Sequence, residues 1–337
     1  GVGLRLSGHT HGGQMWPGTW FAHLVLRYVQ GLHRHGPSWI YVSRGTGFVG
    51  QHLAAALSNA GYNLRILARR PERHRDLRVL RNCKVVPLQA CSTESLSEEF
   101  EQTDAVINLV GILNESGAGT FEELHVKLPE KVIEACLRSK TPRLLHMSAL
   151  NASESRNASK YLHTKGKGEN RVHTLSAGAV KVTSFRPSVI FGPDDSFINR
   201  FAQLLRIPGP MPLACPGSTF APVYIGDVVS AFVSSLENKE TFGKRYELCG
   251  PRVFTLKEIV EYIIWHKGIH KPVIGLGDGL SKLQARILGK VPGKPFTMDN
   301  YRSLQVPSVC NEDGLAQLGI QATDMDAIVP RMLGSKR

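Results

Sequence analysis

Ser148, Tyr161 and Lys165 are the residues whose types and spacing best fit catalysis beside a cofactor. Tyr161 and Lys165 are four positions apart, so on a helix they share one face. Ser148 lies upstream in HMSAL, at the end of a predicted strand. A lysine ammonium lowers the pKa of a nearby phenol, and a serine hydroxyl can hold a substrate oxygen. We therefore expect the trio to line the nicotinamide end of a cofactor; proton transfer to an oxygen while a hydride moves is chemistry that such a trio can perform, and turnover of a substrate is the less favoured interpretation.

A glycine turn supplies the second candidate site. Residues 45–50 read GTGFVG, which is G-x-G-x-x-G between a predicted strand at 39–42 and an amphipathic helix. Such a turn directs backbone N–H groups and the positive end of a helix dipole at a pyrophosphate. An ordinary glycine turn is the alternative. The predicted contacts are Gly45, Thr46, Gly47, Phe48, Val49 and Gly50.

The ends of the other predicted strands extend this site. Arg69 and Arg70 follow the second strand about twenty residues past the turn, where arginine fits a ribose 2′-phosphate and an acid would bind a 2′-hydroxyl. This favours NADP(H), with NAD(H) possible, although a solvated basic loop would read the same way. Two further strand ends are candidates for cofactor contact, or ordinary exits into loops. They comprise Asn108, Val110 and Gly111, and, facing the carboxamide, Pro187, Val189 and Ile190.

The elements that must position these residues alternate between strand and helix. The predicted strands are 39–42, 63–68, 84–88, 104–111, 143–150, 180–191 and 245–249. The predicted helices are the run after residue 47 and 121–139, 165–175, 225–237 and 256–266. Nearly continuous apolar strands are typical of parallel sheets buried on both faces. We therefore expect an α/β fold with a doubly wound parallel sheet in residues 38–192, and a smaller lobe in 193–337 over the carboxyl ends of the strands.

Residues 1–37 differ from the rest of the chain. SGHTHGGQ resembles the last metal-binding motif of calcineurin-like metallophosphoesterases, and the resemblance to the end of that family continues to residue 47. It implies His9 and His11 as ligands of a two-metal centre. The bridging carboxylates and further histidines that such a centre needs are missing from the sequence. We therefore predict no metal site, and rank a metal-dependent phosphoesterase last among the functions.

Composition narrows the classes of partner. Hydrophobic residues make up 42% of the 337 positions and charged residues 20%, which is typical of a globular chain. The formal charge of +13 would suit an anionic membrane surface, a phosphate-rich cofactor or nucleic acid. No basic block is interleaved with aromatics, so nucleic acid is not predicted. The six cysteines form no C-x-x-C pair, which argues against zinc or a disulfide framework and favours a reducing compartment.

Several motifs together carry a closer resemblance. They are GTGFVG, NLVGILNE, LLHMSALNA, YLHTKGKGE, SFRPSVIFGP, FAPVYIGDV, YELCGP and LGIQAT. From about residue 45 onward the chain resembles atypical short-chain dehydrogenases/reductases, and more narrowly the family of the NADPH-holding accessory subunit of respiratory complex I. The resemblance implies a Rossmann domain that holds NADPH and serves structure or assembly.

The resemblance also sets the expected partners and place. Complex I or proteins of quinone metabolism are the implied partners, with peripheral contact to anionic membrane. Bacterial members would lie in the cytoplasm or on the inner face of the membrane, and eukaryotic ones in mitochondria. The alternative function is an active NADP-dependent reductase, epimerase or dehydratase on a quinone-like or sugar-nucleotide substrate. Two positions depart from the family pattern: Arg44 replaces a glycine of the turn, and Gln89 replaces an acid facing the adenine, where we still expect it to contact the base.

Overall fold

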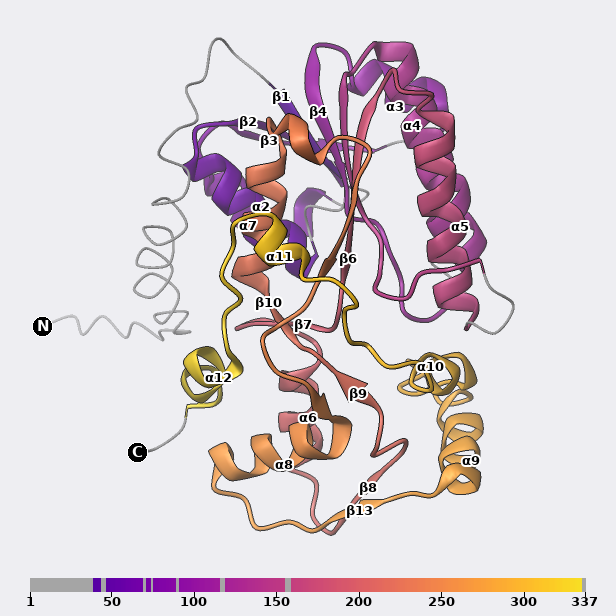
Figure 1. Ribbon diagram of the computed structural model, residues 1–337, viewed down its shortest axis with the longest axis vertical. Helices are drawn as coiled ribbons and strands as arrows, with labels where there is room; N and C mark the ends of the chain where they lie inside the picture. The colour runs from indigo at the N-terminus through magenta and orange to yellow at the C-terminus, as the bar shows by residue number, and fades with distance from the viewer. Residues whose placement is uncertain are drawn as a thin grey trace, which may run out of the picture.

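A parallel seven-stranded sheet forms the centre of the protein (Figure 1). The computed structural model describes residues 39–43, 47–68, 71–73, 75–88, 91–115, 119–154 and 159–334. The sheet order is β11-β6-β5-β4-β1-β2-β3, and each neighbouring pair is parallel. The strands are β1 (Trp39–Ser43), β2 (Asn63–Ala68), β3 (Cys83–Pro87), β4 (Thr103–Asn108), β5 (Arg143–Met147), β6 (Lys181–Pro187) and β11 (Arg245–Leu248). The order reverses between β1 and β4, which is the switch point of a doubly wound fold, as predicted.

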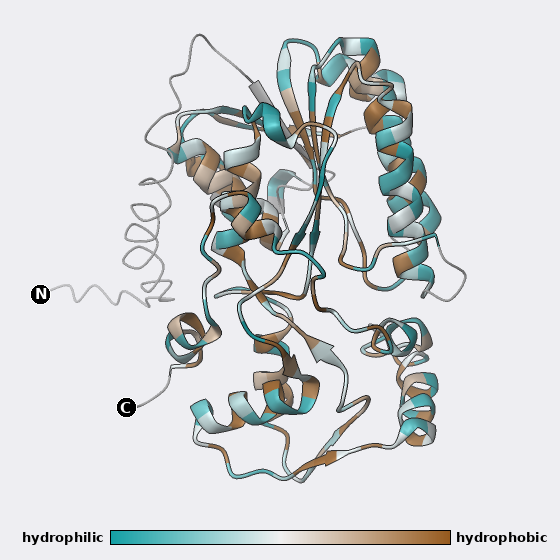
Figure 2. Cartoon of the chain, viewed as in Figure 1, coloured by the Kyte–Doolittle hydropathy of each residue, from teal (hydrophilic) through white to brown (hydrophobic). Residues whose placement is uncertain are grey.

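Helices cover both faces of the sheet (Figure 1). One layer contains α2 (Phe48–Asn59) and α7 (Ile225–Ser235); the other contains α3 (Thr93–Glu99), α4 (Leu128–Ser139) and α5 (Lys160–Leu175). Each layer buries its own apolar cluster against the strands. Leu53 and Leu57 of α2 are fully buried, in agreement with the helical spacing of the sequence. Figure 2 shows apolar residues along the strands and along the helices that flank them.

The remaining elements form a smaller lobe beyond the end of the sheet where β6 leaves it (Figure 1). They are β7 (Ile190–Phe191), α6 (Ile198–Leu204), β8 (Met211–Leu213), β9 (Thr219–Phe220), β10 (Val223–Tyr224), β12 (Phe254–Thr255), α8 (Leu256–Lys267), β13 (Val273–Gly275), α9 (Asp278–Leu288) and α10 (Met298–Ser303). Two short helices follow, α11 (Gly314–Gln317) and α12 (Met325–Leu333). None of the described helices has the length and apolar character needed to cross a bilayer.

The predicted division at residue 192 was wrong for α7 and β11, which lie in the range assigned to the lobe but belong to the helix layer and to the sheet. Most other differences from the sequence-based elements lie at their ends. The sixth strand ends at Pro187, because Ile190 and Phe191 pair with β10 instead. The helix predicted from residue 165 begins at Lys160, because Ser159 Oγ caps it by accepting from Leu162 N at 3.1 Å. The helix predicted at 121–139 begins with a π-helical stretch, Glu122–Lys127, before α4.

The expectation that the cysteines form no disulfide framework was wrong for one pair. Cys249 and Cys310 form a disulfide with their Cα atoms 6.0 Å apart. Ser188 connects β11 to the segment that contains Ser308. Its N–H donates to Leu248 O at 2.9 Å, and its hydroxyl donates to Ser308 O at 2.8 Å. The bond joins residues 61 positions apart, so no local spacing could reveal it. In the chain-entropy model, closing a loop of that length stabilises the fold by about 4 kcal/mol.

Candidate functional site

One face of α5 carries the candidate site. Tyr161, Lys165 and Glu169 follow one another at four-residue spacing along it. Two glycines in the same helix allow close approach of other backbone. A Cβ at Gly168 would lie 1.7 Å from His125 O, and one at Gly166 would lie 2.5 Å from Ser153 N. The KGKGE sequence therefore presses α5 against the π-helical stretch and fixes where the polar face points.

Tyr161 lies in an aromatic cluster at the start of α5. Its ring centroid is 6.0 Å from that of Phe121 and 5.5 Å from that of His125, both edge-on. Within the described part of the chain its hydroxyl has no hydrogen-bond partner. Burial raises the pKa of Tyr161 to about 12. This corrects the expectation that Lys165 lowers it, because desolvation of the phenolate dominates here.

His125 is a buried neighbour that sequence reasoning missed. Its Nε2 accepts the Ile112 N–H at 3.0 Å, so that nitrogen carries no hydrogen. Nδ1 therefore holds the proton and donates to Thr164 Oγ1 at 3.0 Å. A lone histidine in FEELHVK gives no signal in the sequence. The bonds lock the neutral imidazole between the loop after β4 and α5.

The side chain of Lys165 reaches from α5 to the carboxyl end of β5. Its ammonium donates to Met147 O at 2.6 Å, and the side chain is buried. Burial lowers the pKa of Lys165 to about 8, opposed by the nearby Glu169 carboxylate. Gly111 faces the ammonium: a Cβ there would lie 3.7 Å from Nζ. The structure thus brings Lys165, Gly111 and Tyr161 to one edge of the sheet.

The Ser148 hydroxyl bonds to Glu169 of α5. It donates to Glu169 Oε2 at 2.5 Å. Glu169 is fully buried and also pairs with Arg186 at 2.8 Å and with Arg245 at 2.6 Å. Glu169 continues the spacing of Tyr161 and Lys165, and Arg186 lies in the RPSVIFGP motif, so both could have been found in the sequence. The proton of the serine hydroxyl is therefore already used in a hydrogen bond to the cluster of Glu169, Arg186 and Arg245.

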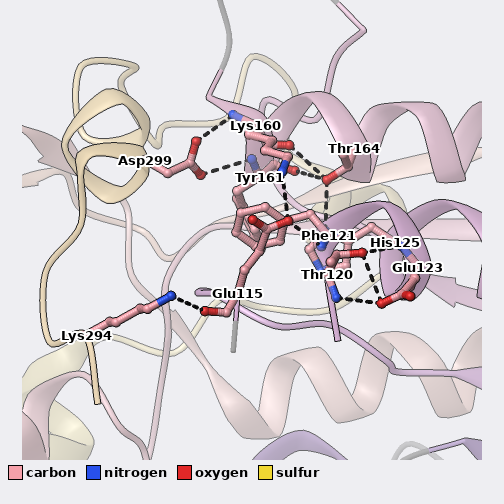
Figure 3. A network of polar contacts seen from close by, with 10 residues as sticks. All are labelled: Glu115, Thr120, Phe121, Glu123, His125, Lys160, Tyr161, Thr164, Lys294 and Asp299. Carbon is pink, nitrogen blue, oxygen red and sulfur yellow. Dashed lines mark hydrogen bonds and ion pairs between the residues drawn. The ribbon is translucent and has the colours of Figure 1, made fainter. Parts of the chain in front are cut away.

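A second polar network ties the start of α5 to the smaller lobe (Figure 3). Asp299 of α10 accepts the Lys160 N–H at 2.7 Å and the Tyr161 N–H at 3.0 Å. Glu115 pairs with Lys160 Nζ at 2.9 Å, and its carbonyl accepts from Lys294 Nζ at 2.9 Å. These contacts satisfy the free N–H groups of the helix start. They make the position of Tyr161 depend on a segment more than a hundred residues away.

The glycine turn is described only from Gly47. Gly47 is the N-cap of α2 in an extended conformation, and α2 has no side-chain cap and no acid in its first turn. Phe48, Val49 and Gly50 form that first turn, and among the described residues no side chain caps their N–H groups. Several predicted residues lie outside the described ones: His9, His11, Arg44, Gly45, Thr46, Arg69, Arg70 and Gln89.

The remaining predicted contacts have roles within the protein. Asn108 Oδ1 accepts the Val110 N–H at 3.2 Å, and its amide lies 3.3 Å from His146 Nδ1. Pro187 O accepts from Leu150 N at 3.0 Å, and Val189 O accepts from Val223 N at 2.9 Å. Ile190 pairs with Val223 in β10. These groups shape the edge of the sheet beside Lys165. Within the described residues no cluster of three or more His, Cys, Asp or Glu could hold a metal ion.

Comparison with curated proteins gives several mitochondrial relatives with related names. The chain is 30% identical over 240 residues to NADH dehydrogenase [ubiquinone] 1 alpha subcomplex subunit 9, mitochondrial, of Rattus norvegicus, covering 69% of this chain and 62% of that protein. The Arabidopsis thaliana protein of the same name is 27% identical over 306 residues, covering 86% and 74%. The chain thus spans about three-fifths of the rat relative's length. A short match, 48% over 50 residues and 14% of either chain, is to an uncharacterized metallophosphoesterase of Helicobacter pylori.

Solved structures share the fold at low identity. The Thermotoga maritima UDP-glucose 4-epimerase has a TM-score of 0.69 at 15% identity, covering 88% of this chain and 98% of that one. MoeE5 in complex with UDP-glucuronic acid and NAD has a TM-score of 0.66 at 17% identity, covering 88% and 97%. A family model matches residues 40–249, which span the sheet from β1 to the end of β11. The chain belongs to the NAD dependent epimerase/dehydratase family.

Proposed function

We propose that the protein holds a nicotinamide dinucleotide across the carboxyl edge of its sheet. The observation that carries the proposal is Lys165: a buried ammonium with three donors and a single acceptor, Met147 O, among the described residues. A buried cation with unused donors is costly unless a ligand completes its hydrogen bonds. The hydroxyls of a nicotinamide ribose would do so, beside Gly111 and Tyr161.

The far end of the same edge fits the pyrophosphate. Among the described residues the first turn of α2 has no side-chain cap, and its N-cap is a glycine, so a phosphate can approach the N–H groups of that turn. When bound, the dinucleotide would supply a hydride donor or acceptor at its nicotinamide. Lys165 would orient the ribose, and the Tyr161 hydroxyl would hold or move a proton at its oxygen.

The hydrogen bond that Ser148 makes within the protein supports a role in holding the dinucleotide over a role in turning over a substrate. Its hydroxyl already donates to Glu169, so it is not free to donate to a substrate oxygen. We accordingly propose an accessory or assembly role around complex I or ubiquinone metabolism, consistent with the names of the curated relatives. We further propose that Arg69 and Arg70 give a preference for NADP(H) over NAD(H). In a bacterium the protein would be cytoplasmic or attached peripherally to the inner face of the membrane, and in a eukaryote it would lie at the mitochondrial inner membrane or in the matrix.

The test is the identity of the nucleotide released from purified protein, read by mass spectrometry. We expect NADPH or NADP⁺, and a larger rise in melting temperature with added NADPH than with NADH. A protein that releases no nucleotide and melts at the same temperature with either one would refute the proposal.

A second candidate is an active reductase, epimerase or dehydratase, which the partner-free Tyr161 hydroxyl favours. Under it, Tyr161→Phe abolishes oxidation of bound NADPH by a quinone-like or sugar-nucleotide substrate and leaves the cofactor bound. If no such substrate oxidises NADPH in the wild-type protein, the accessory role stands.

A further inference from the structure

Helix α9 is packed with its small residues inward and its large apolar residues outward. Ser281 and Ala285 are fully buried, whereas Leu280, Leu283 and Ile287 are 58%, 49% and 57% exposed. At 100° per residue these three side chains lie within about 60° of one another on the helix. Burial normally takes the large apolar side chains first, so this orientation is the reverse of the usual one.

The exposed apolar surface continues on both sides of α9. Ile274 in β13, just before the helix, is 51% exposed, and Val291, just after it, is 41% exposed. α9 and β13 lie at the outer end of the smaller lobe, away from the sheet (Figures 1 and 2). Among the described residues, the large exposed apolar side chains outside residues 204–291 are Val79, Leu113 and Leu137. The apolar surface is therefore concentrated on one lobe, and a concentrated patch marks an interaction site.

The same segment is strongly basic. Between residues 271 and 294 the only acid is Asp278, and it pairs with Lys282 at 2.7 Å. The other cations of this segment are Lys271, Arg286, Lys290 and Lys294. Arg286 and Lys290 are exposed and form no ion pair within the described part of the chain. An anionic partner would therefore find cations beside the apolar stripe.

Lipid fits this composition better than a protein partner does. The stripe contains only Leu, Ile and Val with lysine and arginine around it, whereas protein interfaces favour aromatic residues and methionine and are depleted in lysine. Aliphatic side chains enter the acyl boundary of a bilayer, and long basic side chains reach the headgroups from the same helix. We propose that α9, with Ile274 and Val291, docks the protein on an anionic bilayer surface. This specifies the peripheral attachment proposed above and rests on that part of the proposed function, not on the dinucleotide.

The test is flotation of the full chain with phosphatidylcholine vesicles, with and without phosphatidylglycerol. We expect binding to the anionic vesicles alone, weakening as salt is raised. Arg286→Glu/Ile287→Ser should reduce binding by about tenfold or more, since it reverses a surface charge and removes an exposed apolar side chain that would enter the bilayer. The matched control is Arg78→Glu/Val79→Ser, an exposed Arg–aliphatic pair on the other lobe, with Val79 82% exposed. It should bind as the wild type does.

Three outcomes would overturn the proposal. They are equal binding to neutral vesicles, equal loss in both double variants, and a concentration-dependent dimer that Arg286→Glu/Ile287→Ser dissociates. The last would assign the face to a second copy of the chain. Nucleotide content measured on the same samples separates this result from the fate of the dinucleotide proposal, because neither double variant lies near Lys165.

Discussion

The two ends of the polar face of α5 differ in how completely their groups are satisfied. At the inner end, Glu169 has a hydroxyl donor and two guanidinium partners, so its charge is compensated without any ligand. At the outer end, Tyr161 has no partner for its hydroxyl among the described residues, and Lys165 uses one donor of three. The two ends lie only two helical turns apart.

On this account the fully paired end of α5 stabilises the fold, and the end with unused donors is the candidate ligand site. Buried polar groups that are fully paired stabilise one arrangement, whereas buried groups with unused donors are where a ligand can bind. The Ser148 hydroxyl bonds to the inner end, although its position in the sequence predicted a place beside Tyr161 and Lys165. The predictions below test that division, from the largest effect to the smallest.

Removing the carboxylate of the inner end should cost the most. Glu169→Ala leaves Arg186 and Arg245 partly buried without their anion and leaves the Ser148 hydroxyl unpaired, so we expect a loss of about 3–5 kcal/mol in the free energy of unfolding. Denaturant titration measures it. The control is Glu130→Ala, which breaks the more exposed pair with Arg171 and should cost no more than about 1 kcal/mol. Equal costs for the two variants would show that the inner cluster has no special structural role.

Releasing the outer end from the smaller lobe should cost less. Asp299→Ala removes the acceptor of the Lys160 and Tyr161 N–H groups, and we expect a loss of about 1–2 kcal/mol. Hydrogen exchange at those two amides should speed up, while amides in the middle of α5 stay protected. Thr255→Ala, which removes the cap of α8, is the control and should leave α5 unchanged. Unaltered exchange at both amides in the Asp299 variant would argue that α10 does not position Tyr161.

The pH dependence of stability should also test the inner end, because the charges of Glu169, Arg186 and Arg245 act on the nearby His173. Burial lowers the pKa of His173, which bonds Ser184 at 2.9 Å, from 6.5 to about 4. A lowered pKa in the folded state means that this contribution is complete above pH 6.5 and is lost as the pH falls toward 4. His173→Gln should therefore reduce the loss of stability between pH 7 and 4 by about 1–2 kcal/mol, less than the full shift implies because the ring is half-buried. Identical pH profiles would contradict a neutral, half-buried imidazole at this position.

Much of the fold was predictable because its signals are local. The apolar runs predicted the strands and the alternation of strand and helix predicted a doubly wound parallel sheet, but the place of β11 at the edge of that sheet was not predicted. The spacing of Tyr161 and Lys165 correctly predicted a shared helical face. The disulfide, the Asp299 contacts and the direction of the Ser148 hydroxyl were not predictable, because each depends on residues from distant elements meeting at one point. The pKa of Tyr161 was predicted with the wrong sign, because the sequence shows a neighbouring charge but not the extent of burial.

The most direct test of the division along α5 compares Lys165→Met with Ser148→Ala in one pair of measurements, NADPH titration and thermal denaturation. Lys165→Met should weaken NADPH binding by about tenfold or more with little loss of melting temperature, because it removes a ligand donor that is costly to bury. Ser148→Ala should lower the melting temperature and leave NADPH affinity within about threefold, because its hydroxyl serves Glu169. If Ser148→Ala weakened binding as much as Lys165→Met, or if Lys165→Met had no effect on binding, the account would be contradicted.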